Sequence, residues 1–303
     1  MADRFWEFTG DGPVAERPLG RAAFLLVPGR PDGGEMLAGT DSGGLVRVPG
    51  MSPESVTRPL ALSRDGARVV LCTGRIDRPE RQLVVRTLAT GEQRVFDALA
   101  DGTARYAALS PDGGRLAVLS DDASEVHASV TVTDLAGGAV RRLWLAEGEA
   151  SAEGAVSWSP DGRLLAVTYL ADGEFAATAI LEVADGRQLA FYDELLTLGS
   201  ANGSWSDDRE LVLVEEDPEE DVPPLFVRDV LSGGTVRHDW NSEQRGGVLA
   251  VWDGRLVHDK PGVGLCTTAF DGSDPRPLLR IDTTGWGIWF FDLAPGALTT
   301  FPG

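Results

Sequence analysis

The chain has 303 residues, of which 43% are hydrophobic, and 27 Lys and Arg against 47 Asp and Glu give it a net charge of −20. No apolar run approaches the roughly 20 residues of a membrane helix, and the N-terminus lacks a basic stretch leading into an apolar one, so we expect no membrane span and no secretion signal. Nucleic acid is disfavoured as a partner because its phosphates are bound mainly by Lys and Arg. Two cysteines cannot build a disulfide framework. The composition therefore predicts a cytoplasmic protein with room for a large core.

A hairpin motif recurs along the chain: an apolar run, then Ser-x-Asp-Gly, then a second apolar run. The strong copies centre on residues 63–66, 110–113, 159–162 and 204–208, and weaker ones on 31–33 and 253–254. Strand-forming residues on both sides of a turn whose Gly tolerates positive φ predict a tight β-hairpin.

A second marker is an alternating strand that ends in a polar residue, an apolar residue and a Gly-containing turn. The residue before the apolar one falls at positions 7, 47, 87, 134, 182, 229 and 269. Successive copies are 40 to 48 residues apart, and the step from 269 through the C-terminus back to 7 is 41 residues. This spacing predicts a closed ring of similar units.

Each unit has room for four short strands, A to D from the inside out, which is the content of one β-propeller blade. We predict an all-β chain in which residues 1–303 form one seven-bladed propeller of four-stranded antiparallel blades. Residues 286–303 would supply two strands of blade 7, at 287–291 and 297–301. Residues 1–17 would supply the other two, at 4–8 and 14–17, so that pairing the chain ends closes the ring. A six-bladed ring with ragged termini is the alternative.

The marker Trp6-Glu7-Phe8-Thr9-Gly10 and the Ser-Pro-Asp-Gly turns resemble the repeats of WD-repeat and TolB-like propellers. The chain departs from the WD pattern because it lacks the Gly-His dipeptide and, in most blades, the Trp. The resemblance implies a rigid disc that binds proteins or peptides on one face. It does not identify the partner, since propellers have many unrelated functions.

Acidic residues gather in the predicted B–C and D–A loops of blades 3 to 5, which share one face of such a propeller. The residues assigned to partner binding are Asp121, Asp122, Glu125, Glu215, Glu216, Asp217, Glu219, Glu220 and Asp221. An acidic rim of this kind would attract a basic segment of a protein or peptide partner. The alternative interpretation is that these charges only keep the protein in solution.

Arginines precede several predicted inner strands, which places them at the mouth of the central channel. The candidate ligand-binding residues there are Arg21, Arg58, Arg105, Tyr106, Glu153, Asn202, Arg245 and Trp286. Arginine suits bidentate capture of a carboxylate or phosphate, so these residues predict a site for an anionic small molecule. The alternative is that each Arg pairs with an acidic neighbour in its own loop.

The sequence shows no catalytic constellation. It lacks a Gly-x-Ser-x-Gly elbow, a phosphate-binding Gly-Lys loop and the full sialidase Asp box, and its three His residues have no metal-ligand spacing. We therefore predict no cofactor and no metal centre, and interpret Cys72 and Cys266 as buried thiols. Two functions stay open: a non-catalytic scaffold that binds a protein or peptide, and a small-molecule binder or enzyme that works at the channel mouth.

Overall fold

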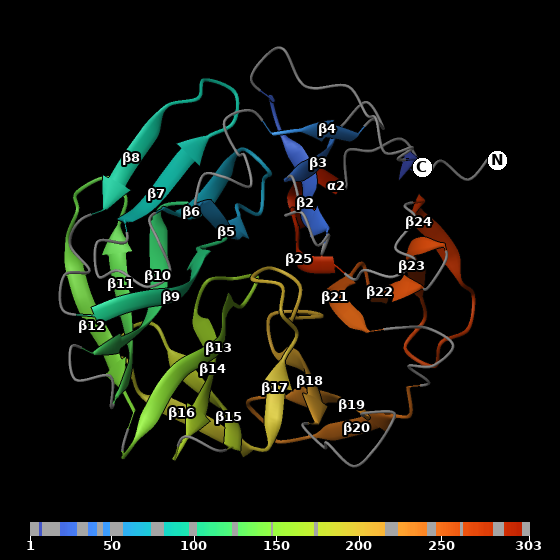
Figure 1. The fold of residues 1–303 in the computed structure, drawn as a ribbon. Helices are drawn as coiled ribbons and strands as arrows, with labels where there is room; N and C mark the ends of the chain where they lie inside the picture. The colour runs from blue at the N-terminus through green and yellow to red at the C-terminus, as the bar shows by residue number, and fades with distance from the viewer. Residues whose placement is uncertain are drawn as a thin grey trace.

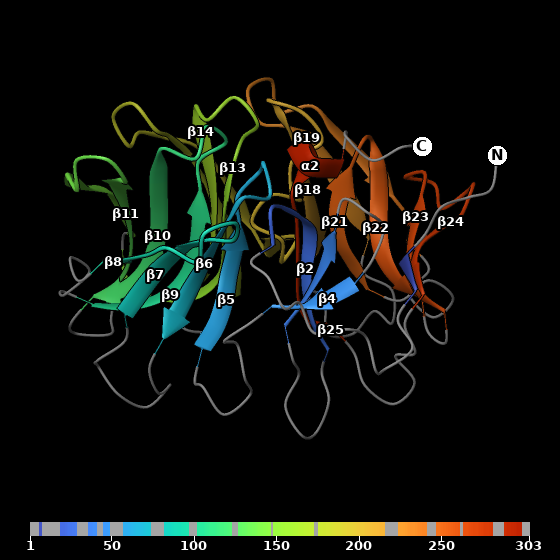
Figure 2. The ribbon, with the colours of Figure 1, turned by 90° about the horizontal axis from the view of Figure 1, so that it is seen from above.

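Six β-sheets stand around a central axis like the blades of a propeller, as the ribbon shows from the front and from above (Figures 1 and 2). This computed structural model describes residues 6–7, 19–28, 36–40, 45–48, 57–73, 82–96, 102–122, 127–146, 148–172, 175–215, 224–240, 247–260, 263–280 and 288–298. Within these ranges, each blade contains four antiparallel strands.

Blades 2 to 6 follow one another along the chain, each beginning with its innermost strand. Blade 2 contains β5 (Thr57–Leu62), β6 (Arg68–Thr73), β7 (Gln82–Thr87) and β8 (Gln93–Phe96), and blade 3 contains β9 (Gly102–Leu109), β10 (Arg115–Asp122), β11 (Ala128–Asp134) and β12 (Val140–Leu145). Blade 4 contains β13 (Ala150–Trp158), β14 (Leu164–Ala171), β15 (Phe175–Glu182) and β16 (Gln188–Asp193). Blade 5 contains β17 (Leu195–Thr197), β18 (Glu210–Glu215), β19 (Leu225–Asp229) and β20 (Thr235–His238), and blade 6 contains β21 (Val248–Trp252), β22 (Arg255–Lys260), β23 (Gly264–Thr268) and β24 (Arg276–Arg280).

Blade 1 joins the two ends of the chain and so closes the ring. Its innermost strand, β25 (Ile288–Leu293), comes from the C-terminal part, and β2 (Ala22–Pro28), β3 (Leu37–Thr40) and β4 (Leu45–Arg47) come from the N-terminal part. Strands β25 and β2 run antiparallel, with Leu293 opposite Phe24. Pairing distant segments in this way leaves no open seam in the ring.

The prediction of seven blades is wrong, and the six-bladed alternative describes the fold. The marker at position 7 lies in β1 (Trp6–Glu7), which pairs in parallel with β24 as a fifth, outer strand and belongs to no further blade. The marker at position 47 ends the outermost strand of blade 1, whereas the later markers end the third strand of their blades or directly follow it. The similar spacing of the markers therefore led to a wrong number of blades, because the markers lie on strands that are not equivalent.

The composition predicted for the closing blade is corrected as well. One C-terminal and three N-terminal strands meet there, instead of two from each end. A strand expected at residues 297–301 is replaced, over its described part, by the short helix α2 (Pro295–Leu298). The strand expected at residues 14–17 lies outside the described residues.

The Ser-x-Asp-Gly turns are the A–B hairpins that the sequence predicts. In blade 3, Ser110 Oγ donates to Asp112 Oδ1 at 2.5 Å, Gly114 N donates to the same oxygen at 2.9 Å, and Arg115 N donates to Ser110 Oγ at 2.9 Å. The same pattern recurs in the turns at 63–68 and 159–164. Gly113 has a φ of +66°, the left-handed region that favours glycine. Each turn thus satisfies its polar groups locally, which is why the sequence shows it clearly.

Apolar clusters fill every interface between neighbouring blades. One cluster spans blades 2 to 4, and four others join blades 4 and 5, 5 and 6, 6 and 1, and 1 and 2. The ring is therefore packed all the way round, including the interface between the last blade and the one that joins the termini. Among the described residues, no helix is long and apolar enough to cross a membrane.

Candidate functional site

Five of the six inner strands carry a register shift upstream of their last two residues. The register shifts at Leu60 in β5, at Arg105 in β9, between Ser151 and Ala155 in β13, and at Leu249 in β21. Strand β25 shows the same shift between Ile288 and Phe290. A β-bulge bends a strand and redirects its side chains, and bulges are frequent beside binding sites. We call this end of the channel, where the inner strands begin, the D–A end.

Two of the predicted arginines face defined partners at the D–A end. The guanidinium of Arg58, at the start of β5, lies over the ring of Tyr106 in β9, with its carbon 5.2 Å from the ring centroid. Arg105, the bulged residue of β9, donates from Nε to Asp121 Oδ2 at 2.9 Å. The other oxygen of Asp121 accepts a hydrogen bond from Ala152 N of blade 4 at 2.6 Å. Neighbouring blades are thus connected through these side chains.

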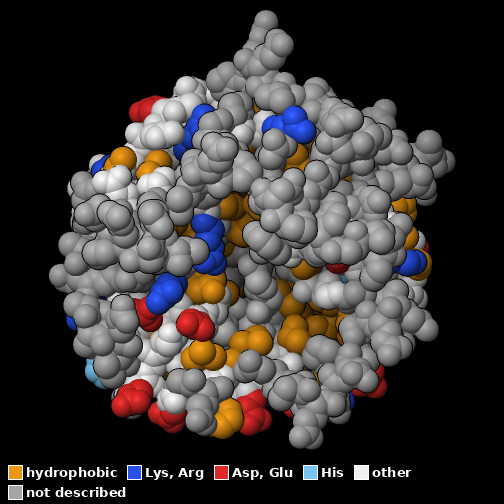
Figure 3. Space-filling view, in the orientation of Figure 1, with side chains coloured by type: hydrophobic (Ala, Val, Ile, Leu, Met, Phe, Trp, Pro, Cys, Tyr) orange, Lys and Arg blue, Asp and Glu red, His pale blue; other side chains and the backbone are white. Residues whose placement is uncertain are grey.

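Side chains of both signs remain accessible at the D–A end. Arg58 and Glu153 are exposed, and the side chain of Arg105 is 34% exposed. Figure 3 looks onto this face of the ring, where basic, acidic and apolar side chains surround the middle. The structure therefore brings together four of the predicted ligand-binding residues: Arg58, Arg105, Tyr106 and Glu153.

The opposite end, which we call the A–B end because the inner strands end there in their A–B turns, is closed by a segment of blade 5. Strand β17 stops at Thr197, and residues 198–204, the floor segment, cross the channel before Trp205 pairs with Leu211. Gly203 O accepts a hydrogen bond from Val251 N of blade 6, and Ala201 O accepts one from Ser157 Oγ of blade 4 at 2.8 Å. Asn202 Nδ2 donates to Leu62 O in blade 2, on the far side of the ring.

Asp292 fixes the floor segment to the strand that closes the ring. Its carboxyl is fully buried and accepts hydrogen bonds from Leu62 N at 2.7 Å, Ser200 Oγ at 2.6 Å and Asn202 N at 3.1 Å. Burial raises the pKa of Asp292 to about 6. Asp292 was not among the residues predicted from the sequence, although a single carboxylate inside the apolar run Trp289-Phe290-Phe291-Asp292-Leu293 is a signal for a buried polar role.

Two other predicted ligand-binding residues lie away from the D–A end. Asn202 belongs to the floor segment and faces Asp292 and Leu62. Arg21 directly precedes β2, which is the second strand of blade 1, so it lies at the A–B end near Asp65. Arg21 was misplaced because the sequence did not distinguish an inner strand from its neighbour, and Asn202 because the inner strand β17 ends early, at Thr197. Arg245 and Trp286 lie outside the described residues.

The predicted acidic rim is described only in part. Asp121 is 2% exposed and faces Arg105 and Ala152, so it contributes no charge to the surface. Asp122 ends β10, and Glu215 ends β18 and is half-buried. The remaining members, Glu125, Glu216, Asp217, Glu219, Glu220 and Asp221, lie outside the described residues.

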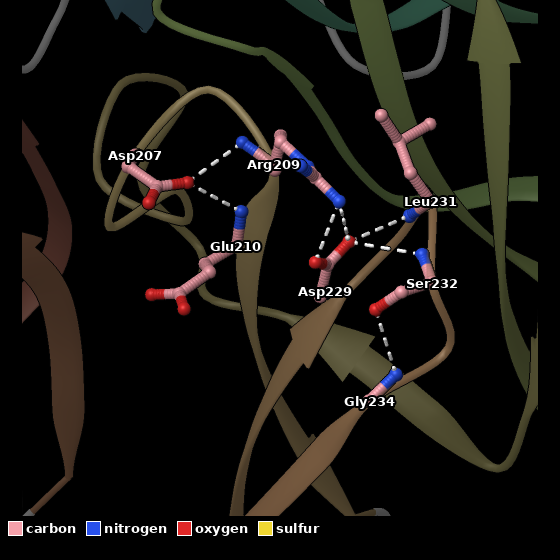
Figure 4. Close-up of polar contacts among 7 residues, drawn as sticks. All are labelled: Asp207, Arg209, Glu210, Asp229, Leu231, Ser232 and Gly234. Carbon is pink, nitrogen blue, oxygen red and sulfur yellow. Dashed lines mark hydrogen bonds and ion pairs between the residues drawn. The ribbon is translucent and has the colours of Figure 1, made fainter.

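The polar residue of the second marker caps a turn on the A–B face. In blade 5, Asp229 accepts hydrogen bonds from Leu231 N and Ser232 N, both at 3.0 Å, and pairs with Arg209 at 2.8 Å (Figure 4). Hydrogen bonds lower the pKa of Asp229 to about 2, and the bond from the Ser232 backbone N–H has the largest effect. Asp134 accepts the equivalent backbone bonds in blade 3. These carboxylates stabilise turns, and we assign them no ligand. Within the described ranges, no three His, Cys, Asp or Glu residues gather as metal ligands would.

Solved structures share this fold at low sequence identity. TolB from Acinetobacter baumannii is similar with a TM-score of 0.59 and 14% identity, over 91% of this chain and 66% of that chain, so this chain spans about two thirds of its length. A nidogen/laminin complex is similar with a TM-score of 0.55 and 13% identity, over 89% of this chain and 98% of that chain. Hydrazine synthase from Kuenenia stuttgartiensis is similar with a TM-score of 0.52 and 16% identity, over 87% of this chain and 80% of that chain. No family model and no curated protein matches the sequence. The comparisons define a β-propeller with a TolB-like fold, and they do not show membership of the WD-repeat family.

Proposed function

We propose that this protein is a binding propeller that holds a segment of a protein or peptide partner at the D–A end of its channel. The observation that carries the proposal is the contrast between the ends. Residues 198–204 fill one end with internal hydrogen bonds, whereas Arg58, Arg105 and Glu153 remain accessible at the other. Side chains held on rigid strands beside variable loops suit recognition.

The fold alone does not choose between binding and catalysis, because the similar structures include a nidogen/laminin complex and hydrazine synthase. Charge supports a partner with a basic segment, since the chain carries a net charge of −20 and the exposed residues near blade 4 include Glu149, Glu153 and Asp172. A negative field speeds association with a basic partner at low salt. A cytoplasmic location is part of the proposal, and cell fractionation measures it.

Affinity capture from native cell extract tests this function. The tagged full-length protein would be compared with R58E, at the D–A end, and R187E, an exposed control on the A–B face with the same change of charge. Bound proteins and small molecules would be identified by mass spectrometry at low salt and at about 0.5 M salt, where surface charges are screened.

We expect one protein partner that R187E retains, that R58E loses and that high salt weakens. Retention of the same partner by R58E would place binding elsewhere on the molecule. A bound anionic small molecule in the absence of any protein partner would replace the proposal by small-ligand binding at the channel mouth.

A further inference from the structure

Two arginines at the D–A end have a charge opposite to the net charge of the molecule. Arg58 and Arg105 come from the adjacent blades 2 and 3 of a chain whose net charge is −20. Tyr106 lies directly after Arg105 in β9, and the guanidinium of Arg58 lies over its ring. Arg58 therefore lies against the strand that carries Arg105.

Arg105 is held in a fixed orientation by a buried carboxylate. Asp121 is 2% exposed and is anchored through one oxygen to Ala152 N, so its other oxygen fixes the Nε edge of the guanidinium. The two η nitrogens of Arg105 make no hydrogen bond to the described residues. A guanidinium oriented in advance, with a donor edge remaining, is suited to bidentate binding of an oxyanion.

Arg58 is held differently, by a cation–π contact. Its guanidinium lies over the ring of Tyr106 at 5.2 Å and makes no hydrogen bond to the described residues, so its N–H donors are available. Arg58 is also exposed, so a ligand can reach its guanidinium without displacing another side chain of the protein. Both arginines therefore present donors at the same end of the channel.

We propose that Arg58 and Arg105 bind the C-terminal carboxylate of a peptide whose preceding residues are basic. This assignment rests on the proposed function and names the chemistry of the partner segment. The floor segment favours binding of the end of a peptide, because a peptide cannot pass through a channel that residues 198–204 cross. Glu153 follows Ala152, the residue that anchors Asp121, and its exposed carboxylate would accept hydrogen bonds from a basic side chain of the same peptide.

The net charge selects among oxyanions. A field from 20 excess negative charges repels a polyanion such as a phosphorylated compound more strongly than a peptide whose single carboxylate is accompanied by basic side chains. A peptide of this kind also agrees with the charge argument for a basic partner segment.

The test is affinity selection with the full-length protein on an equimolar mixture of two short random peptide libraries, one with a free C-terminal carboxylate and one with a C-terminal amide. Mass spectrometry counts the recovered peptides of each kind. We expect the free acids to be enriched about tenfold to a hundredfold, the range for a charge-assisted hydrogen-bond pair. Lys and Arg should be enriched near their C-termini.

Variants separate the roles of the residues. R58A should bring the acid-to-amide ratio close to one, whereas R187A on the A–B face should leave it unchanged. R105K keeps a cation beside Asp121 but loses the planar fork, and it should weaken the preference for acids. E153Q should abolish the enrichment of basic residues and keep the preference for the carboxylate. Melting temperatures close to that of the wild type would show that each variant folds.

Equal recovery of acids and amides, or an acid preference that persists in R58A, would overturn the assignment. Calorimetry with succinate alone is a further arm. If succinate binds the wild type and not R58A while peptides show no acid preference, the carboxylate belongs to a small molecule and the peptide assignment is wrong. The proposed function is tested separately, by the capture from cell extract. If R58E loses a partner whose binding does not depend on its C-terminal carboxylate, the proposed function stands and only the carboxylate assignment is wrong.

Discussion

The same six inner strands line both ends of the channel, yet the ends differ in chemistry. At the A–B end, Asp292 is fully buried and Asn202 donates across the ring to Leu62 O. At the D–A end, Arg58 and Glu153 are exposed and Arg105 is 34% exposed. One end satisfies its polar groups inside the protein, and the other presents them to solvent.

This difference follows from how each end of an inner strand is built. At the A–B end, short Ser-x-Asp-Gly hairpins end the strands, and Trp158 Nε1 donates to Ala108 O at 3.0 Å, which ties neighbouring inner strands together. Toward the D–A end, bulges such as that at Arg105 redirect side chains. We infer that the A–B end stabilises the ring and that the D–A end carries recognition.

The largest effect should come from removing the carboxylate at the A–B end. D292A would leave the buried donors of Leu62, Ser200 and Asn202 without their acceptor. We expect a loss of about 3–5 kcal/mol in the free energy of unfolding, measured by urea denaturation. D239A, at a side chain that is 88% exposed, is the control and should change stability by less than about 0.5 kcal/mol. An equally small effect of D292A would remove Asp292 from the account of ring closure.

The same carboxyl should give the molecule a pH dependence of known sign. Burial raises the pKa of Asp292 to about 6 from its ordinary value of 3.8, so the folded state binds its proton more tightly than the unfolded state does. Its contribution to stability is therefore full below the unfolded pKa and is lost as the pH rises through the folded pKa. A folded-state pKa about 2 above the unfolded one corresponds to about 3 kcal/mol of stability.

The measurement compares wild type with D292N from about pH 4 to about pH 7.5. Relative to D292N, the wild type should lose about 2–3 kcal/mol of stability as the pH rises across this window. Carboxylates with lowered pKa values, such as Asp65, Asp112 and Asp274, act in the opposite direction but are common to both proteins. A constant difference between the two proteins across the window would contradict the raised pKa.

The sequence predicted the hairpins well because their stabilising contacts are local. Ser63, Asp65 and Arg68 bond within one turn, and the spacing of such residues is visible in the chain. The number of blades depends instead on which distant strands pair. Strand β1 resembles the later markers in sequence, but it adds to the outer edge of blade 6. Spacing alone could not show that pairing.

The candidate site was predictable to a similar extent. Arg58 lies near the start of β5, and Arg105 and Tyr106 lie in β9 ahead of its A–B turn, so the repeat assigned them to the correct end of their inner strands. Asn202 was misplaced because β17 is only three residues long and the chain then crosses the channel. The Arg105–Asp121 contact joins different strands of blade 3, whereas the alternative interpretation expected each Arg to pair with an acidic neighbour in its own loop.

At the D–A end, a smaller effect is expected when Arg105 is removed. In R105A, Asp121 would keep the hydrogen bond from Ala152 N but lose its cationic partner while remaining buried. We expect a loss of about 1–2 kcal/mol in the free energy of unfolding, reduced from the value for a fully buried pair because a third of the Arg105 side chain is exposed. Urea denaturation of R105A and of the double variant R105A/D121A measures it. The double variant should recover part of the loss, and no recovery would show that Asp121 does not need the pairing.

The smallest effect on stability should come from Arg58, and this makes it the sharpest probe of the comparison. Arg58 is exposed and touches the ring of Tyr106, a contact worth about 0.5–1 kcal/mol at an exposed site. R58A should therefore lower the free energy of unfolding by less than about 1 kcal/mol while abolishing partner capture. A protein that loses binding without losing stability would separate the two ends by function as well as by structure. If R58A instead unfolds as readily as D292A, the D–A end is part of the framework, and recognition must be sought on another surface.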